Sequence, residues 1–139
     1  MKIMSVDLGL SRTGIATCDP MEMLASPVKV IFEKYEPKLI EEIVKTANEL
    51  YAELIVVGYP LNMDGSEGER AKECKRIAEI IEEKSGVKTA MWDERCTTVM
   101  SHNALNVTNV RGQKRKSIVD AVAAVMILES YLDYRKNNK

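Results

Sequence analysis

The sequence predicts an α/β domain with a mixed five-stranded sheet and helices on its faces. Three observations carry this prediction. Three short β-type segments at the start of the chain are separated only by turn residues, which indicates an antiparallel meander. Further along, apolar residues recur every three or four positions, as on one face of a helix. Two more apolar segments alternate with these helical ones, so right-handed crossovers make strands one, four and five parallel.

Turn residues and changes of hydrophobic period locate each element in order. Residues 54–58 form an unbroken apolar run, typical of a central strand buried on both faces. Gly86 ends the second helix. In the last helix, Asp120 follows Ser117 by three residues, which is the pattern of a capping box at a helix start. The expected strands span residues 2–7, 14–19, 28–32, 54–58 and 87–92, and the expected helices begin near Glu36, Ala71, Thr98 and Ser117.

Length and composition bound the class of protein. A chain of 139 residues with 45% hydrophobic and 29% charged residues is expected to form one domain, residues 1–139. It contains no apolar segment of the roughly 18 residues that a membrane span needs. The apolar start breaks off at Asp7, too soon for a signal peptide, so we expect a cytoplasmic protein. Three widely spaced cysteines fit neither a disulfide framework nor a zinc site.

Acidic residues fall at three places where charge is costly. Asp7 ends the first strand, Asp93 and Glu94 follow the fifth, and Asp120 interrupts an otherwise apolar helix. Since the carboxyl ends of parallel strands share one edge of the sheet, we expect these acids to meet there. Carboxylates about 4 Å apart repel by roughly 4 kcal/mol per pair at an effective dielectric near 20. Mg²⁺ or Mn²⁺ offsets such repulsion, and the chemistry that this suggests is metal-assisted hydrolysis of a phosphodiester.

Each acid also has a structural interpretation. Asp7 is equally suited to accept hydrogen bonds in the turn that follows it. Asp120 is placed to cap a helix, and an ordinary salt bridge with Arg95 is the commoner fate of a residue such as Asp93 or Glu94. The joint pattern of acids is therefore more informative than any one of them.

Three further segments are candidates for substrate contact. The basic run that contains Lys114, Arg115 and Lys116 directly precedes the helix of Asp120, and it is either a solvated loop or a phosphate-binding one. Asn62 lies in a turn-rich loop after the fourth strand, where Asp64-Gly65 indicates a turn. Thr97 and Thr98 are suited either to bind phosphate or to cap the helix that follows.

Four ordered motifs resemble those of the YqgF (RuvX) family over nearly the whole chain. They are Ser5-Val6-Asp7-Leu8-Gly9 with Arg12-Thr13-Gly14, the segment 57–66, Asp93-Glu94-Arg95-Cys96-Thr97-Thr98, and Val119-Asp120-Ala121-Val122-Ala123-Ala124. To this family are ascribed Holliday junction resolution and maturation of the small-subunit ribosomal RNA precursor. The resemblance implies a ribonuclease H-like fold and a metal-dependent phosphodiesterase site.

Carried over by position, the resemblance makes Asp7, Glu94 and Asp120 the metal ligands, with Glu94 favoured over Asp93. It also places Arg12 and Arg95 near substrate phosphate. Tyr59 and Cys96 stand where a leucine is common in the family, and neither change touches an acid.

The expected partner is structured RNA or branched DNA, with a dimer if the protein resolves junctions. Two other classes compete with a nuclease. One is a nucleic-acid-binding module of the same fold without catalysis. The other is an ATP-handling protein of the actin and sugar-kinase superfamily, which needs two such domains where this chain has room for one.

Overall fold

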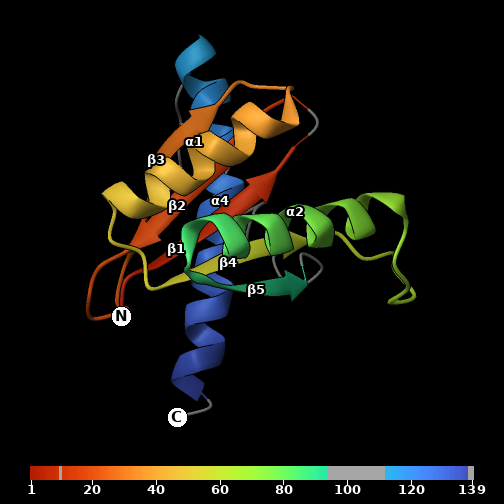
Figure 1. Ribbon diagram of the computed structural model, residues 1–139. Helices are drawn as coiled ribbons and strands as arrows, with labels where there is room; N and C mark the ends of the chain where they lie inside the picture. Colours follow the sequence, from red (N-terminus) through yellow and green to blue (C-terminus); the bar gives the residue numbers. More distant parts are fainter. Residues whose placement is uncertain (10, 94–111, 138–139) are drawn as a thin grey trace.

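The computed structural model describes residues 1–9, 11–93 and 112–137, with the backbone alone for residues 112–121. Five strands form one sheet in the order β3-β2-β1-β4-β5. The ladders β1–β2 and β2–β3 are antiparallel, and β1–β4 and β4–β5 are parallel, as the sequence predicts. The described elements are β1 (Ile3–Leu8), β2 (Thr13–Cys18), β3 (Ala25–Ile31), α1 (Glu36–Glu49), β4 (Leu54–Tyr59), α2 (Glu69–Ser85), β5 (Lys88–Asp93) and α4 (Gly112–Asn137) (Figure 1).

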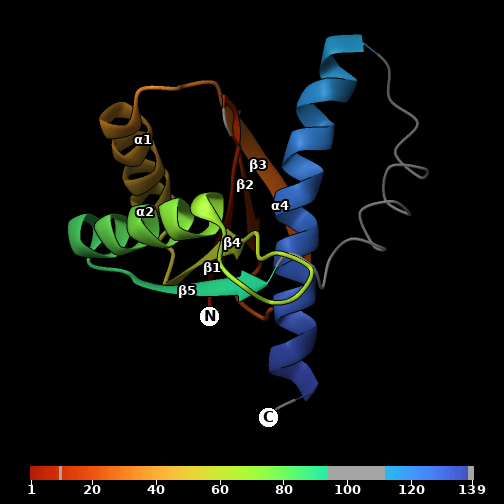
Figure 2. The same cartoon turned by 90° about the vertical axis from the view of Figure 1, so that its right-hand side faces the viewer.

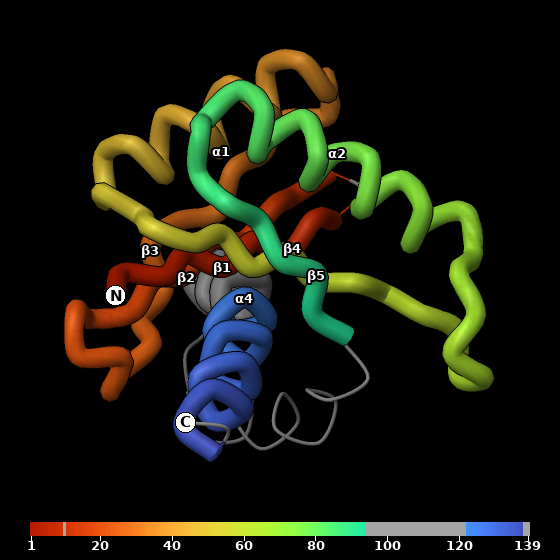
Figure 3. The backbone as a smooth tube through the Cα atoms, turned by 60° about the horizontal axis from the view of Figure 1, so that its bottom comes forward, coloured from red at the N-terminus to blue at the C-terminus, as the bar shows by residue number. Residues whose placement is uncertain are grey.

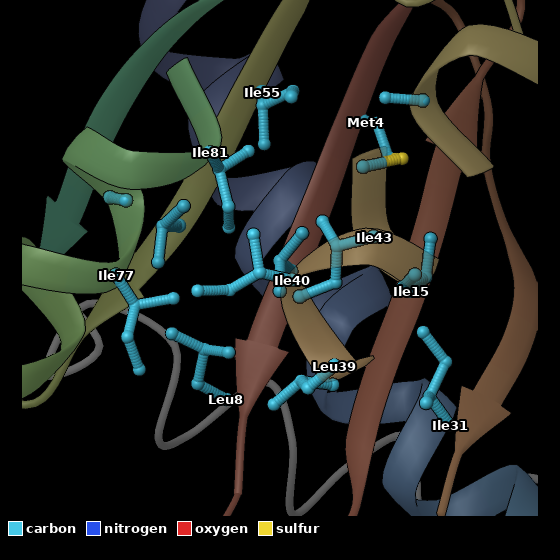
Figure 4. Close-up of a cluster of buried hydrophobic side chains, with 14 of the residues drawn as sticks. Met4, Leu8, Ile15, Ile31, Leu39, Ile40, Ile43, Ile55, Ile77 and Ile81 are labelled. Atoms are coloured by element: carbon cyan, nitrogen blue, oxygen red, sulfur yellow. The ribbon is translucent and has the colours of Figure 1, made fainter. Parts of the chain in front are cut away.

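The sheet separates two hydrophobic cores. Helices α1 and α2 cover one face and α4 covers the other (Figure 2). Under α1 and α2, Met4, Val6 and Leu8 of β1 pack against the isoleucines of both helices (Figure 4). Under α4, Ile3 of β1 packs against the apolar residues that follow Ala121. Because side chains alternate along a strand, each position of β1 can be assigned to one of these two faces.

Helix α4 runs antiparallel to β1. Near its C-terminal end, Arg135 donates to Glu22 at 2.6 Å, and the carboxylate of Glu22 lies 3.5 Å from the ammonium group of Met1. Further back along the helix, the carbonyl of Ala124 accepts a hydrogen bond from Ser5. The helix therefore passes β1 from its end toward its start, beneath the sheet in the view of Figure 3.

Two expectations for element bounds are corrected. Strand β3 begins at Ala25 and includes Pro27, which the sequence placed in a turn before it. Proline is tolerated there because β3 is an edge strand, and the ladder is irregular beside Ala16, the partner of Pro27.

Helix α4 starts at Gly112, so Lys114, Arg115 and Lys116 lie in its first turns and not in a preceding loop. Ser117 is therefore inside the helix, and the capping box predicted there is wrong. The helix expected from Thr98 to about residue 106 lies outside the described residues. Among the described helices, none is both long and apolar enough to cross a membrane.

Candidate metal centre and nucleic-acid interface

Asp7 lies on the face of the sheet that α4 covers. It shares the alternation of Ile3 and Ser5, which are fully buried under α4, whereas Met4, Val6 and Leu8 point to the other core. Asp7 itself is half-buried at the C-terminal end of β1. The strand thus places this carboxylate at the edge of the sheet and toward the helix that carries Asp120.

Glycines border Asp7 on both sides along the sheet. Gly14 of β2 is its direct partner in the β1–β2 ladder. On the other side, Gly58 follows Val57, the β4 partner of Val6, so it occupies the neighbouring position beside Asp7. Both glycines are buried and neither carries a side chain that would fill the space over the carboxylate. On the face toward α4, the positions on both sides of Asp7 therefore carry backbone alone.

The turn after β1 is closed by Gly9 and Arg12. The N–H of Gly9 donates to the carbonyl of Arg12 at 2.9 Å. A Cβ on Gly9 would lie only 2.2 Å from that carbonyl oxygen, so no larger residue fits without moving the backbone. This close approach positions the half-buried Arg12, one of the predicted substrate-binding residues, in the turn that follows Asp7.

Arg70 supports the end of β1, a role that the sequence did not reveal. Its guanidinium donates to the carbonyl of Leu8 at 2.6 Å and lies 3.2 Å from the carboxylate of Glu73. Arg70 sits in the first turn of α2. Its contact with Leu8, the residue next to Asp7, follows from the packing of α2 on the sheet, and no local pattern indicates it.

The loop between β4 and α2 is organised by its own side chains. Asn62 donates its amide to Ser66 at 3.0 Å, and Ser66 donates to Asp64 at 2.6 Å. Gly65 has φ 88°, and its N–H donates to the carbonyl of Asn62, so the turn expected at Asp64-Gly65 is confirmed. Asn62 is exposed, and its bond to Ser66 fixes where its side chain stands.

A phenol and a carboxylate join the two ends of the same loop. The hydroxyl of Tyr59, the last residue of β4, hydrogen-bonds to Glu67. This bond, followed by desolvation and the negative charge of Glu67, raises the pKa of Tyr59 to about 12. The phenol therefore stays protonated at neutral pH and keeps donating.

At the end of β5, the neighbouring residues Trp92 and Asp93 belong to opposite faces of the sheet. Ala90 and Trp92 pack in the core under α4, whereas Met91 packs in the core under α1 and α2. Asp93 shares the alternation of Met91, so it belongs to the face opposite Asp7. Trp92 donates its indole N–H to Ser130 of α4 at 3.0 Å and packs edge-on against Tyr131, with ring centroids 5.3 Å apart. The strand thereby fastens the C-terminal half of α4.

The remaining predicted site residues are only partly described. Glu94, Arg95, Thr97 and Thr98 lie outside the described residues. For Asp120, Lys114, Arg115 and Lys116 the structure gives the helix position alone. The described side chains contain no group of three acids, histidines or cysteines suited to a metal. Two of the three predicted ligands, Glu94 and Asp120, have side chains outside this described set.

Solved structures with the same architecture define the class of this fold. Thermus thermophilus RuvC in complex with a Holliday junction substrate matches with TM-score 0.65 at 10% identity, over 99% of this chain and 96% of that one. The fowlpox virus resolvase with Holliday junction DNA matches with TM-score 0.55 at 11% identity, over 97% of this chain and 99% of that one. The fold is therefore that of the ribonuclease H-like resolvases, an α/β fold.

Sequence comparison then gives the family. The profile of the RuvX family, described as Holliday junction resolvase, matches residues 1–134. A protein of Agathobacter rectalis named "Putative pre-16S rRNA nuclease" is 36% identical over all of this chain and 99% of its own length. A protein of the same name from Desulfitobacterium hafniense is 39% identical over 96% of this chain and 93% of its own. The chain belongs to the RuvX (YqgF) family, as the sequence motifs indicate.

A sugar kinase also shares part of the fold. The ROK hexokinase of Thermus thermophilus matches with TM-score 0.51 at 19% identity, over 77% of this chain but only 38% of the kinase. This likeness is one of fold alone.

Proposed function

We propose that the protein is a metal-dependent nuclease that hydrolyses phosphodiester bonds of structured nucleic acid, with the ribosomal RNA precursor as its first candidate substrate. The observation that carries the proposal is the setting of Asp7. It stands at the sheet edge between Gly14 and Gly58 and faces the helix that carries Asp120. A turn acceptor would not need a helix with an acidic residue opposite to it.

Asp7, Glu94 and Asp120 would hold Mg²⁺ or Mn²⁺, because a set of carboxylate oxygens suits these hard cations. The metal supplies charge neutralisation at the scissile phosphate and a water of lowered pKa. Glu94 is favoured over Asp93 because Asp93, by the alternation of Met91 and Trp92 before it, belongs to the face of the sheet opposite Asp7. Asp93 then remains a supporting residue of the same edge.

The substrate would be held around this site by cationic and polar groups. Arg12 stands in the turn beside Asp7, and the helix turns that carry Lys114, Arg115 and Lys116 precede Asp120 on α4. Asn62, Arg95, Thr97 and Thr98 complete the proposed set. Arginine and lysine recognise phosphate without reading the base, which suits a substrate defined by structure.

RNA is the first candidate because full-length relatives at 36–39% identity carry the name of an rRNA nuclease, whereas the junction-bound structures are only 10–11% identical. A junction resolvase would moreover need two such sites to cut paired strands, and therefore a dimer.

A cleavage panel tests the proposal. Precursor ribosomal RNA and a four-way DNA junction are incubated with Mg²⁺, with Mn²⁺ and with a chelator. Asp7→Asn and Asp120→Asn should abolish cleavage, and Asp133→Asn is the matched control, because Asp133 is an exposed acid elsewhere on α4. Equal cleavage by Asp7→Asn and wild type would refute the nuclease assignment. Nucleic-acid binding without turnover on either substrate would instead support a binding module of the same fold.

A further inference from the structure

Ser5 is a buried polar residue in an otherwise apolar row of the sheet. Its ladder partners are Ala16 on β2 and Val56 on β4, and all three are fully buried. A methyl or isopropyl group would fill this position without the cost of burying a hydroxyl. The hydroxyl therefore calls for a specific explanation.

Its hydrogen bond crosses from the sheet to the last helix. Ser5 Oγ donates to the carbonyl of Ala124 at 2.6 Å, across 119 residues of sequence. Ala124 lies well inside α4, where a carbonyl already accepts the N–H four residues later, so the helix does not need the serine for its own integrity. What the bond adds is a fixed point between β1 and α4.

The Ser5–Ala124 bond lies close in sequence to both proposed metal ligands, Asp7 and Asp120. Asp7 is two residues after Ser5, a displacement of about 6.6 Å along a strand. Asp120 is four residues before Ala124, a displacement of about 6 Å along a helix. Because α4 passes β1 from its end toward its start, at an oblique angle (Figure 1), both displacements lead toward the same end of the sheet and are of similar length. A helix held at Ser5 therefore brings position 120 to the end of the sheet where Asp7 lies.

Given the metal site proposed above, we propose that Ser5 is a positioning residue that sets the register of α4 against β1 and so the separation of the Asp7 and Asp120 carboxylates. Ser5 touches neither metal nor substrate in this assignment. If α4 could slide along β1, the distance between the carboxylates of Asp7 and Asp120 would change. Metal affinity depends on such geometry.

Ser5→Ala removes the hydrogen bond without adding volume. The matched control is Thr46→Val, because Thr46 is likewise buried and donates its hydroxyl to a backbone carbonyl, that of Glu42 at 2.8 Å, but within α1 on the other face of the sheet. Ser5→Thr retains the hydroxyl and serves as the conservative variant. All variants are compared at a temperature at which each is fully folded.

The first readout is Mn²⁺ affinity measured by titration calorimetry without substrate, and the second is the Mg²⁺ concentration that gives half-maximal cleavage. We expect Ser5→Ala to weaken both by about tenfold or more, the usual effect of losing a group that orients a metal ligand. Thr46→Val should leave both close to wild type, and Ser5→Thr should restore most of the loss.

The outcomes separate this inference from the proposed function. Equal Mn²⁺ affinity in Ser5→Ala and Thr46→Val would overturn the positioning role while leaving the nuclease assignment intact. A wild-type protein that binds Mn²⁺ but cleaves nothing would refute the nuclease, and the positioning role would then stand or fall on the affinities. No Mn²⁺ binding by the wild type would overturn both.

Discussion

Asp7 and Gly14 lie directly opposite each other in the antiparallel ladder of β1 and β2. Paired residues of a ladder point to the same face of a sheet, so the site of any side chain at position 14 adjoins the carboxylate of Asp7. Glycine leaves that position without a side chain.

A side chain at position 14 should impair metal binding at the proposed site. We expect Gly14→Ala to lower Mn²⁺ affinity and cleavage, and Gly14→Val to lower them further, because each added methyl occupies more of the space beside the carboxylate. Because Gly14 is buried, we also expect valine to lower the free energy of unfolding. Calorimetry, cleavage and thermal unfolding on the same samples separate the two effects. Full affinity in a folded Gly14→Val variant would show that the site does not require glycine at position 14.

Gly9→Ala should destabilise the turn that follows Asp7. The new Cβ would meet the carbonyl oxygen of Arg12 at 2.2 Å, so the turn must open and weaken the bond from the Gly9 N–H. We expect a loss of roughly 1–3 kcal/mol in the free energy of unfolding, the range of substitutions that strain a backbone. Urea denaturation measures it. Gly68→Ala is the control, because its nearest contact would be the Asn62 side chain at 3.4 Å; equal losses in both variants would remove the special role of Gly9.

The ion pair between Glu36 and Arg76 should make the free energy of unfolding depend on pH. Two hydrogen bonds of 2.6 and 2.9 Å join the start of α1 to α2. They hold the pKa of Glu36 below its ordinary value of 4.5, mainly through the hydrogen bond from Arg76. A lowered pKa means that the stabilisation is present above about pH 4.5 and is lost as the pH falls through the pKa of the folded state.

Glu36→Gln should therefore lower the free energy of unfolding at pH 7 by less than about 1 kcal/mol, since both partners are substantially exposed. The difference from wild type should shrink as the pH falls through the pKa of Glu36 in the folded state, because the wild-type carboxyl then also becomes neutral. Thermal unfolding over a series of pH values from 7 downward measures it. Glu41→Gln, exposed on the same helix, is the control. A deficit of unchanged size at low pH would show that the effect of Glu36 is not one of charge.

The basic turns at the start of α4 should govern binding to the nucleic-acid backbone. Replacing Lys114, Arg115 and Lys116 by alanine is expected to weaken RNA binding and to flatten its dependence on salt. The log–log slope should fall by about 0.7 for each phosphate of a single strand that the variant no longer neutralises. Fluorescence anisotropy at several salt concentrations measures both affinity and slope. The control replaces Lys72, Lys75 and Lys84, which are exposed on α2. An unchanged slope in the α4 variant would place the phosphates elsewhere.

Local sequence patterns were sufficient to predict the order and pairing of the strands. The apolar run 54–58 forms β4, and Gly86, with φ 73°, ends α2 as expected. These features depend on the hydrophobic pattern of a short segment and on the backbone sterics of single residues, and both can be read locally in the sequence. The predicted element bounds were wrong where the tertiary structure determines the local conformation. Pro27 is part of a strand because that strand is an edge, and Lys114, Arg115 and Lys116 continue a helix that the charge pattern alone assigned to a loop.

For the site, the sequence predicted Asp7 and the segments that carry the other acids, and these stay predictions; it did not indicate the residues that hold these segments in place. Ser5 and Arg70 act through contacts with segments 119 and 62 residues away. A single serine in a strand or arginine on a charged helix gives no signal of such a contact. The face of Asp93, too, became evident only from the cores that Met91 and Trp92 join.

The long reach of the Ser5–Ala124 bond also bears on how the chain folds. One face of the sheet, including Ile3 and Val56, is covered by a helix that begins only at Gly112, so this apolar surface stays exposed until that helix has been synthesised. Contacts so distant in sequence form slowly, and an uncovered sheet face invites aggregation. At the ribosome, assembly of the proposed acidic site would therefore be among the last events of folding, and a chain interrupted before α4 would carry Asp7 without the helix that carries Asp120.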